Sequence, residues 1–282
     1  MSVAPPWLLD HAPYVPFMER RTAHPPGLMP LDMTHWTVRH ADFDAQMLRR
    51  AEVMRDHADI VIGSRHEAEE PGVELLAMLK EHLGMDPGIT PLEEFCVWTA
   101  IAHMVAEDFC LMVPDTASGE YKLAGAILCF PSRWLLSEKL GRPMTVIHDP
   151  VPDYDDLLAR RVNRVFNVLH VDRPLVRVNW LVHADPELFL PLGVDEKQTD
   201  RSQNVDAIYL RTERQTLVRL PESKAVAFGI KTSVTPLACL SPAEAAGLKA
   251  ALEGYHGDEI AYRSGSPVLD RARRQLAEIA CA

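Results

Sequence analysis

The sequence of 282 residues contains few cysteines, and their positions exclude several kinds of site. The five cysteines are widely spaced and form no Cys-x-x-Cys pair, so neither a zinc ribbon nor an iron–sulfur cluster is predicted. A Gly-rich dinucleotide-binding motif is also absent from the sequence. Apolar runs stay well short of the ~20 residues that a membrane-spanning helix needs. The N-terminal segment lacks a basic stretch followed by an apolar one, so we predict no signal peptide and expect a cytoplasmic protein.

Positive charge is in short supply. The chain has 29 Lys and Arg against 40 Asp and Glu, which gives a formal net charge of −11. Because phosphate binding needs a cationic surface, this balance argues against nucleic acid as a partner and suits a small cationic ligand. The composition, 47% hydrophobic and 24% charged, is that of an ordinary globular protein with a core large enough to enclose a cofactor.

Periodic apolar residues predict several helices. One helix is expected over residues 42–62, with Met47, Leu48 and Met54 among its apolar positions, and another over 73–83. A further helix is expected after Asp153, and a last one from about Ser266 to Ile279. Two capping motifs, in which Glu can return a hydrogen bond to a Ser or Thr cap, predict additional helix starts at Thr90-Pro91-Leu92-Glu93 and Ser241-Pro242-Ala243-Glu244.

Alternating or continuously apolar segments predict five strands, over residues 109–113, 121–130, 176–183, 208–220 and 226–232. Two strands, a helical middle and three more strands is the order of a PAS-type sheet. We therefore predict an α+β fold with a PAS-like five-stranded antiparallel sheet and helical N- and C-terminal flanks. The expected parts of this single compact unit are an N-terminal arm and helical flank at 1–105, the PAS-like core at 106–235, and C-terminal helices at 236–282.

A histidine near the middle of the chain is the first candidate for chemistry. An apolar strand runs into a Phe-Pro stop and a short helical turn, and His148 follows, between Ile147 and the stiff segment Asp149-Pro150-Val151-Pro152. Imidazole is a common metal ligand, and rigid neighbours can fix its direction, so His148 is a candidate axial ligand for a haem iron. A histidine packed beside a turn explains the same pattern.

Two predicted strands carry polar residues that need an explanation. Period two places Arg177, Asn179 and His183 on one face of their strand. This face is either solvated or the polar wall of a pocket, in which Arg177 would suit a carboxylate such as a haem propionate.

In the following strand, Arg211 and Glu213 share a face and Arg214 points to the other. Long polar side chains in mid-strand indicate either an exposed ladder of ion pairs or contacts with a ligand.

Two further charged groups are open to both structural and functional interpretations. The adjacent carboxylates Glu107 and Asp108 could poise a proton or hold an ammonium group, but the pair is more typical of a solvated boundary. Arg160, Arg161 and Arg164 form a basic helical face. Such a face is usually only solvated, although an acidic electron-donor protein could dock there.

Several ordered strings of residues carry a resemblance to a known family. AEDFCLM, AGAILCFPSRWLLSEKLGRP, IHDPVP, VRVNW and LRTERQTLVRLP resemble the α subunit of haem-dependent oxidative N-demethylases, also described as dimethylamine monooxygenase-type proteins. The similarity runs from about Gly27 to about Thr235. One departure is Ala106, which stands where Gln would be expected before the Glu-Asp pair and puts the identity of the amine in doubt.

The resemblance implies a PAS-like fold that binds haem b, with His148 in the position of the proximal ligand. It implies O2-dependent oxidation of a small secondary methylated amine to formaldehyde and the shorter amine. Electrons would arrive from NADPH through a ferredoxin- or flavin-reductase-type donor that carries FMN and a [2Fe–2S] cluster on other chains. A tetrahydrofolate-binding subunit could capture the formaldehyde.

On this interpretation the arginines are expected to hold the haem propionates, with Arg177, Arg211 and Arg214 as candidates. Asn179 and Glu213 are candidates for polarising bound oxygen or for holding the amine. Two alternatives from other classes stay open. One is a haem-based gas or redox sensor, because PAS folds commonly sense. The other is a haem-free scaffold subunit.

Overall fold

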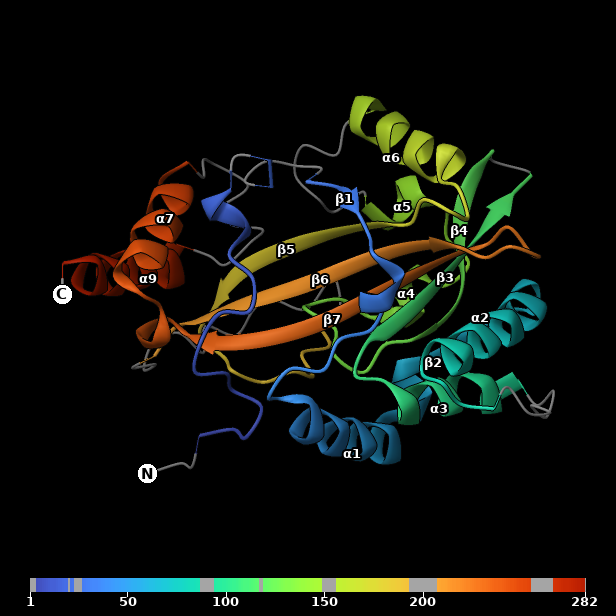
Figure 1. The fold of residues 1–282 in the computed structure, drawn as a ribbon, viewed down its shortest axis with the longest axis horizontal. Coiled ribbons are helices and arrows are strands. Elements are labelled where there is room, and N and C mark those ends of the chain that lie inside the picture. Colours follow the sequence, from blue (N-terminus) through green and yellow to red (C-terminus); the bar gives the residue numbers. More distant parts are fainter. Residues whose placement is uncertain are drawn as a thin grey trace.

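An antiparallel sheet of seven strands, in the order β1-β5-β6-β7-β3-β4-β2, forms the centre of the computed structural model (Figure 1). The structure describes residues 4–19, 21–22, 27–86, 94–116, 119–148, 156–192, 207–254 and 266–281. Within these ranges, the side chains at 94–96, 148, 156–161 and 266 are not described. The strands are β1 (Met29–Pro30), β2 (Ile62–Ser64), β3 (Asp108–Asp115), β4 (Glu120–Ile127), β5 (Leu175–His183), β6 (Tyr209–Arg219) and β7 (Val226–Pro236).

Mixed helix and sheet is confirmed as the fold class, but the predicted number of five strands is wrong within the described residues. All five predicted strands are present as β3 to β7, and two short strands extend the sheet at its edges. β1 pairs with β5, and β2 pairs with β4. Strands of two or three residues carry no readable periodicity, so only their tertiary pairing reveals them.

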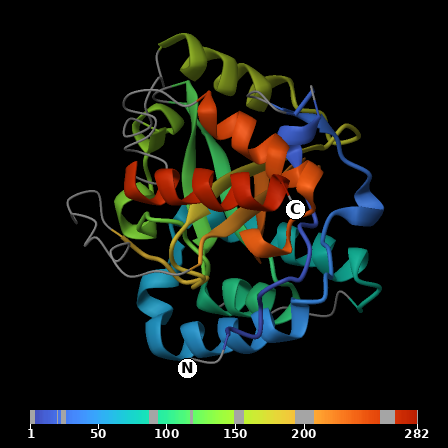
Figure 2. The ribbon, with the colours of Figure 1, turned by 90° about the vertical axis from the view of Figure 1, so that its left-hand side faces the viewer.

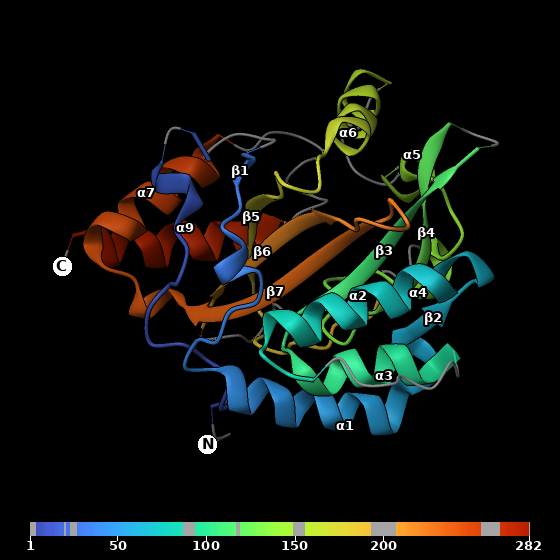
Figure 3. The same cartoon turned by 45° about the vertical axis from the view of Figure 1, so that its right-hand side comes forward.

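Helices cover both faces of the sheet (Figures 1 and 3). On one face, here called the α1 face, lie α1 (Phe43–Val61), α2 (Glu69–His82) and α3 (Glu94–Met104). The opposite face, called the α4 face, is covered by α4 (Leu136–Lys139), α5 (Met144–His148) and α6 (Asp156–Val168). Two further helices among the described residues, α7 (Pro242–Glu253) and α9 (Ser266–Ala280), lie across one end of the sheet, as Figure 2 shows.

Alternate strand residues divide between two cores, as period two requires. Phe109, Leu111 and Ala227 belong to the core under α1–α3, and the neighbouring Cys110 and Val226 belong to the core under α4–α6. A third apolar cluster joins α7 and α9 to the ends of β5 and β6 through Trp180, Val182 and Leu210.

Close packing of α3 on the sheet depends on a glycine in β4. A Cβ atom at Gly125 would lie 2.4 Å from Cζ2 of Trp98 and 2.8 Å from Cβ of Ala68. Because the indole of Trp98 is 1% exposed and cannot move aside, any larger residue at 125 would push α3 off the sheet. The glycine therefore sets the distance between the two layers.

The predicted helix boundaries are largely confirmed, but the buried side of α1 is not the predicted one. Leu48 is 71% exposed, whereas Gln46, Arg50 and Val53 are buried against the sheet. The predicted capping motif at Ser241 is confirmed, because its side chain and that of Glu244 exchange hydrogen bonds with each other's backbone. The corresponding motif at Thr90-Pro91-Leu92-Glu93 lies outside the described residues.

The described helices include none that is long and apolar enough to cross a membrane.

Candidate functional site

A row of polar side chains crosses β5 and β6 on the α4 face. The register pairs Arg177 with Gln215 and Asn179 with Glu213. Residues directly opposite each other in an antiparallel pair share a face, so these four side chains lie together. The predicted placement of Arg177 and Asn179 on one face of their strand is confirmed, and the register adds Glu213 of β6 to that face.

Glu213 is the centre of this polar row. Its Oε2 accepts hydrogen bonds from Nε2 of Gln215 at 3.0 Å and from Nδ2 of Asn179 at 3.4 Å. Its Oε1 lies 4.0 Å from Nε of Arg211, and the carboxylate keeps 13% of its surface exposed. The carboxylate is thus held in place from two sides while it stays accessible from the α4 face.

Apolar side chains surround the polar row without closing it. Phe228 of the central strand β7 is only half-buried, as are Leu175 and Leu181 of β5, whose outer neighbour is the two-residue β1. In a sheet covered on both faces, central positions are normally fully buried. This part of the α4 face therefore combines accessible apolar surface with a cation, an amide and a carboxylate.

α4 contributes a lysine to the same face. The Nζ atom of Lys139 lies 4.6 Å from the ring centroid of Trp134, within the range of a cation–π contact. Burial lowers the pKa of Lys139, and the thiol of Cys110 and the carboxylates of Glu138 and Glu213 oppose this shift. The sequence carries no signal for Lys139, because Ser137-Glu138-Lys139 resembles an ordinary solvated helix end.

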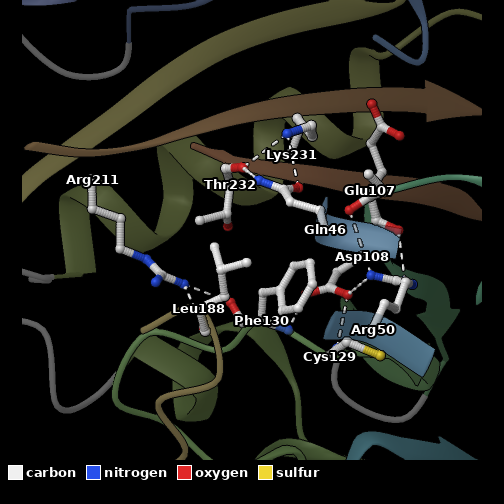
Figure 4. A network of polar contacts seen from close by, with 11 residues as sticks. Gln46, Arg50, Glu107, Asp108, Cys129, Phe130, Leu188, Arg211, Lys231 and Thr232 are labelled. Atoms are coloured by element: carbon white, nitrogen blue, oxygen red, sulfur yellow. Dashed lines mark hydrogen bonds and ion pairs between the residues drawn. The ribbon is translucent and has the colours of Figure 1, made fainter. Parts of the chain in front are cut away.

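Arg211 is committed to backbone carbonyls. It is 1% exposed, and its two Nη atoms donate to the carbonyl oxygens of Phe130 at 2.8 Å, Glu187 at 3.1 Å and Leu188 at 3.2 Å (Figure 4). The guanidinium thereby ties the segment after β4 to the segment after β5. A role in holding a propionate would compete with these three bonds.

Arg214 lies on the α1 face, away from the polar row. Its Nη1 donates to the carbonyl of Trp36 at 3.2 Å, and its Nη2 donates to the carbonyl of His35 at 2.5 Å. The predicted opposite directions of Arg211 and Arg214 are confirmed. Because Arg214 is separated from Arg177 and Glu213 by the sheet itself, it cannot share one site with them.

The interpretation of Glu107 and Asp108 as a solvated boundary is wrong, since each is 1% exposed. Oδ1 of Asp108 accepts from Nη1 of Arg50 at 2.7 Å, and its two oxygens accept the backbone N–H groups of Cys129 and Phe130, each at 2.8 Å (Figure 4). These bonds explain why β4 does not extend to the predicted residue 130: the N–H groups of residues 129 and 130 donate to a side chain instead of a neighbouring strand.

A second buried charge lies on the α1 face. Lys231 of β7 is 0% exposed, and its Nζ bonds to Oδ2 of Asp42 at 3.1 Å and to Oε1 of Gln46 at 2.9 Å. The carboxyl of Glu107 nearby accepts the N–H of Val38 at 2.8 Å, and burial raises its pKa. Lys231 is thus paired with a carboxylate at the start of α1, whereas Arg50 of α1 is paired with Asp108 of β3.

His183 is the third polar residue of β5 that the sequence singled out. It is 8% exposed, and its Nε2 lies 3.5 Å from Oγ of Ser132. Burial lowers the pKa of His183 well below the usual value, and the positive charges of Arg211 and Arg133 add to the effect. The ring is therefore a neutral, packed imidazole at the end of the polar row.

The other predicted ligand, His148, is the last residue of α5, and its side chain lies outside the described residues. So do those of Arg160 and Arg161, whereas Arg164 is exposed. Ala106 is fully buried, and its carbonyl accepts from Arg50 at 3.5 Å.

Comparison with protein families supplies an assignment that these contacts alone do not give. The family model described as haem-dependent oxidative N-demethylase, alpha subunit-like, matches residues 90–272, which is more than half of the chain. The match includes β3 to β7, α4, α5 and both capping residues of α7. It begins later than the resemblance noted from Gly27 and extends beyond Thr235 into α9. The chain therefore belongs to the haem-dependent oxidative N-demethylase alpha subunit-like family.

Proposed function

We propose that the protein is a haem b-dependent oxidative N-demethylase that uses O2 to remove a methyl group from a small secondary amine. The family match supports the haem dependence and the reaction type. The observation that carries the proposal within the chain is the half-open α4 face, where the carboxylate of Glu213 stands among accessible apolar residues. Such a surface suits a small methylated ammonium ion.

The residues of the α4 face are of the kinds that hold a porphyrin. A porphyrin is a flat apolar ring with two carboxylates, and this face offers the half-buried Leu181 and Phe228 together with the guanidinium of Arg177. His148 would bind the iron, Arg177 would hold a propionate, and Arg211 would support the site by fixing residues 130 and 188. The five longer strands follow the order β4-β3-β7-β6-β5, which supports a PAS-like sheet extended by β1 and β2.

Within this site the polar row would bind and orient the amine. Glu213 would accept N–H groups of the substrate, and Asn179, which already donates to Glu213, would keep that carboxylate in position. When bound, haem b supplies the activation of O2 and the oxidising power. The balanced reaction is R–NH–CH3 + O2 + 2 electrons + 2 H⁺ → R–NH2 + CH2O + H2O, and it passes through a carbinolamine that breaks its C–N bond.

The two electrons must come from another protein. We propose an NADPH-dependent donor with FMN and a [2Fe–2S] cluster, because the sequence carries neither a dinucleotide motif nor clustered cysteines. A tetrahydrofolate-binding subunit that takes up formaldehyde, and a cytoplasmic location, complete the proposal.

Visible absorption of the purified chain is the first test. We expect a Soret band after reconstitution with haem, its loss in His148→Ala, and roughly tenfold weaker haem binding in Arg177→Ala, because a charged hydrogen bond contributes about 1.5–3 kcal/mol. Arg164→Ala is the matched control, since this arginine is exposed on α6. A protein that stays colourless would leave a haem-free scaffold instead.

Turnover separates an enzyme from a sensor. The haem-loaded protein is given a chemical reductant, O2 and a panel of methylated amines, and formaldehyde is measured against His148→Ala. Release that depends on the amine supports the demethylase. Haem binding without formaldehyde from any amine would favour a gas or redox sensor.

A further inference from the structure

The helix that ends at His148 is too short to be stable by itself. α5 comprises the five residues Met144–His148, and isolated helices shorter than about 12–15 residues are marginal in water. Its orientation must therefore be set by the elements on which it rests. Those elements decide where its last residue lies.

A carboxylate from β4 holds the first turn of α5. Oε2 of Glu120 accepts a hydrogen bond from the backbone N–H of Thr145 at 3.2 Å and from its Oγ1 at 2.9 Å. The preceding residues are tied to the same strand, because Gly141 N donates to the Leu123 carbonyl at 2.7 Å. Leu123 N in turn donates to the carbonyl of Arg142 at 3.1 Å.

This contact works as a helix cap that comes from another element. The first N–H groups of a helix lack partners within the helix, and a carboxylate near them also interacts favourably with the helix dipole. Here the acceptor is Glu120 on β4 rather than a residue of α5. The cap therefore fixes the helix to the sheet as well as satisfying its first turn.

Helical geometry connects this cap to residue 148. Residues three and four positions apart lie on one side of a helix, so position 148 follows Met144 and Thr145 by one turn. Met144 is 6% exposed and packs in the core of the α4 face. Any rotation or lifting of α5 that broke the Glu120–Thr145 bonds would displace position 148 as well.

We propose that Glu120 is a positioning residue for His148: it clamps α5 to β4 and so sets the distance and direction from which that histidine reaches a metal. The inference rests on the proposed function for the role of His148, but the clamp itself does not. Nothing in the family description assigns Glu120 a role. Glu120 lies at the tip of the β3–β4 hairpin, on the first residue of β4.

Amide hydrogen exchange tests the clamp in the haem-free protein. Glu120→Ala should raise the exchange rate of the N–H groups of residues 145–147 about five- to thirtyfold, since a lost cap corresponds to that factor. Thr145→Val removes only the hydroxyl contact and should cause a smaller increase, and the double variant should add little to Glu120→Ala. Glu120→Gln keeps an acceptor oxygen and should restore most of the protection. The control is Glu67→Ala, which removes the 2.7 Å contact of a carboxylate with Lys122 on the same strand.

Ligation of the iron tests the positioning. In the haem-loaded protein, Glu120→Ala should shift the Soret band and the spin state toward those of His148→Ala and speed haem release at least fivefold, while Glu120→Gln and Glu67→Ala stay close to wild type. In a His148→Ala background, Glu120→Ala should cause no further change in the spectrum. A purely structural role of Glu120 would lower thermal stability without moving the spectrum.

The two proposals fail in distinguishable ways. A wild-type spectrum and wild-type exchange in Glu120→Ala would overturn the clamp. Faster exchange with an unchanged spectrum would overturn the positioning of His148. A wild-type protein that binds no haem, or a His148→Ala variant that keeps an unaltered Soret band, would overturn the proposed function and with it the role of His148, while the exchange data would still decide whether Glu120 holds α5.

Discussion

The two faces of the sheet differ in the exposure and ion pairing of their charged side chains. On the α1 face, Arg50 and Lys231 are at most 1% exposed, and each forms an ion pair within 3.1 Å together with further hydrogen bonds. On the α4 face, Arg177, Asn179 and Glu213 keep part of their surface exposed, 13% for the side chain of Glu213, which lies 4.0 Å from the nearest guanidinium nitrogen of the buried Arg211. Both faces therefore bury an arginine, but only the α4 face also holds charged side chains that solvent reaches.

This difference separates structural charge from candidate functional charge. A buried ion pair often adds little to stability compared with apolar residues, but removing one partner strands the other at a high cost. Removing a partly exposed carboxylate does not leave a buried charge without a partner. Stability therefore does not explain why Glu213 stands on a central strand, and a functional role does. Burial together with a close ion pair therefore identifies the structural set, and partial exposure identifies the candidate site.

The largest effect is expected from breaking a pair on the α1 face. Asp108→Ala leaves Arg50 without its carboxylate and the N–H groups of Cys129 and Phe130 without an acceptor, so the free energy of unfolding should fall by about 3–5 kcal/mol. Urea denaturation followed by circular dichroism measures this loss.

The control for Asp108→Ala is a solvent-exposed Arg–Asp ion pair of the same protein. Arg55→Ala removes the exposed contact of Arg55 with Asp56, and exposed pairs contribute about 0–1 kcal/mol. A loss below about 1 kcal/mol in Asp108→Ala would contradict the assignment of the α1 face as the structural one.

The second effect concerns function and leaves stability nearly unchanged. Glu213→Gln keeps the shape of the side chain but removes its charge, so the KM for the amine should rise about ten- to hundredfold, as expected for a lost charged hydrogen bond. The free energy of unfolding should change by less than about 1 kcal/mol. Formaldehyde kinetics and urea denaturation of the same variant measure both quantities. Glu253→Gln, an exposed carboxylate of α7, serves as the control.

The sequence predicts the strands of the sheet better than the burial and pairing of its charged residues. Alternation identified β5 correctly, because its two faces differ in every second residue, from Val176 opposite the polar row to the buried Val182. The same alternation told Arg211 and Arg214 apart. Periodicity works here because it depends only on residues that are neighbours in sequence.

The solvated interpretation of Glu107 and Asp108 failed for the opposite reason. The cation that pairs with Asp108 is Arg50, which lies 58 positions away in sequence on a helix whose apolar residues indicated a different buried side. A pair made by tertiary contact leaves no periodic signal. The same holds for Glu120 and Thr145, 25 positions apart. His148 could be singled out from its stiff surroundings, but the side chain that holds its helix could not.

The third expected effect is a pH dependence of the free energy of unfolding that comes from His183, at the end of the polar row. Burial, with Arg211 and Arg133 nearby, holds the pKa of His183 well below 6.5 in the folded protein. The unfolded chain therefore binds a proton that the folded chain does not as the pH falls below about 6.5, and stability is lost in that window. The contribution of His183 should be a loss on the order of 1 kcal/mol at pH 5.5 relative to neutral pH.

His183→Gln isolates this contribution, because glutamine keeps a polar group near Ser132 but does not titrate. The difference in unfolding free energy between the two proteins should shrink steadily from pH 7.5 to pH 5.5. Parallel curves for wild type and variant would show that the imidazole is not the group that resists protonation.

The smallest expected effect on stability is that of replacing Lys139 on the α4 face. Lys139 has a pKa lowered by burial, as Lys231 has, but its contact is the ring of Trp134 rather than a carboxylate within an ion-pair distance. Lys139→Met should therefore cost at most about 1 kcal/mol, the contribution of a cation–π contact at a partly exposed site. Lys231→Met, which leaves Asp42 unpaired, should cost several times more. Urea denaturation measures the free energy of unfolding of both variants. Equal losses would mean that lysines are buried and paired on both faces of the sheet, so that solvent exposure would not distinguish the α4 face as the site.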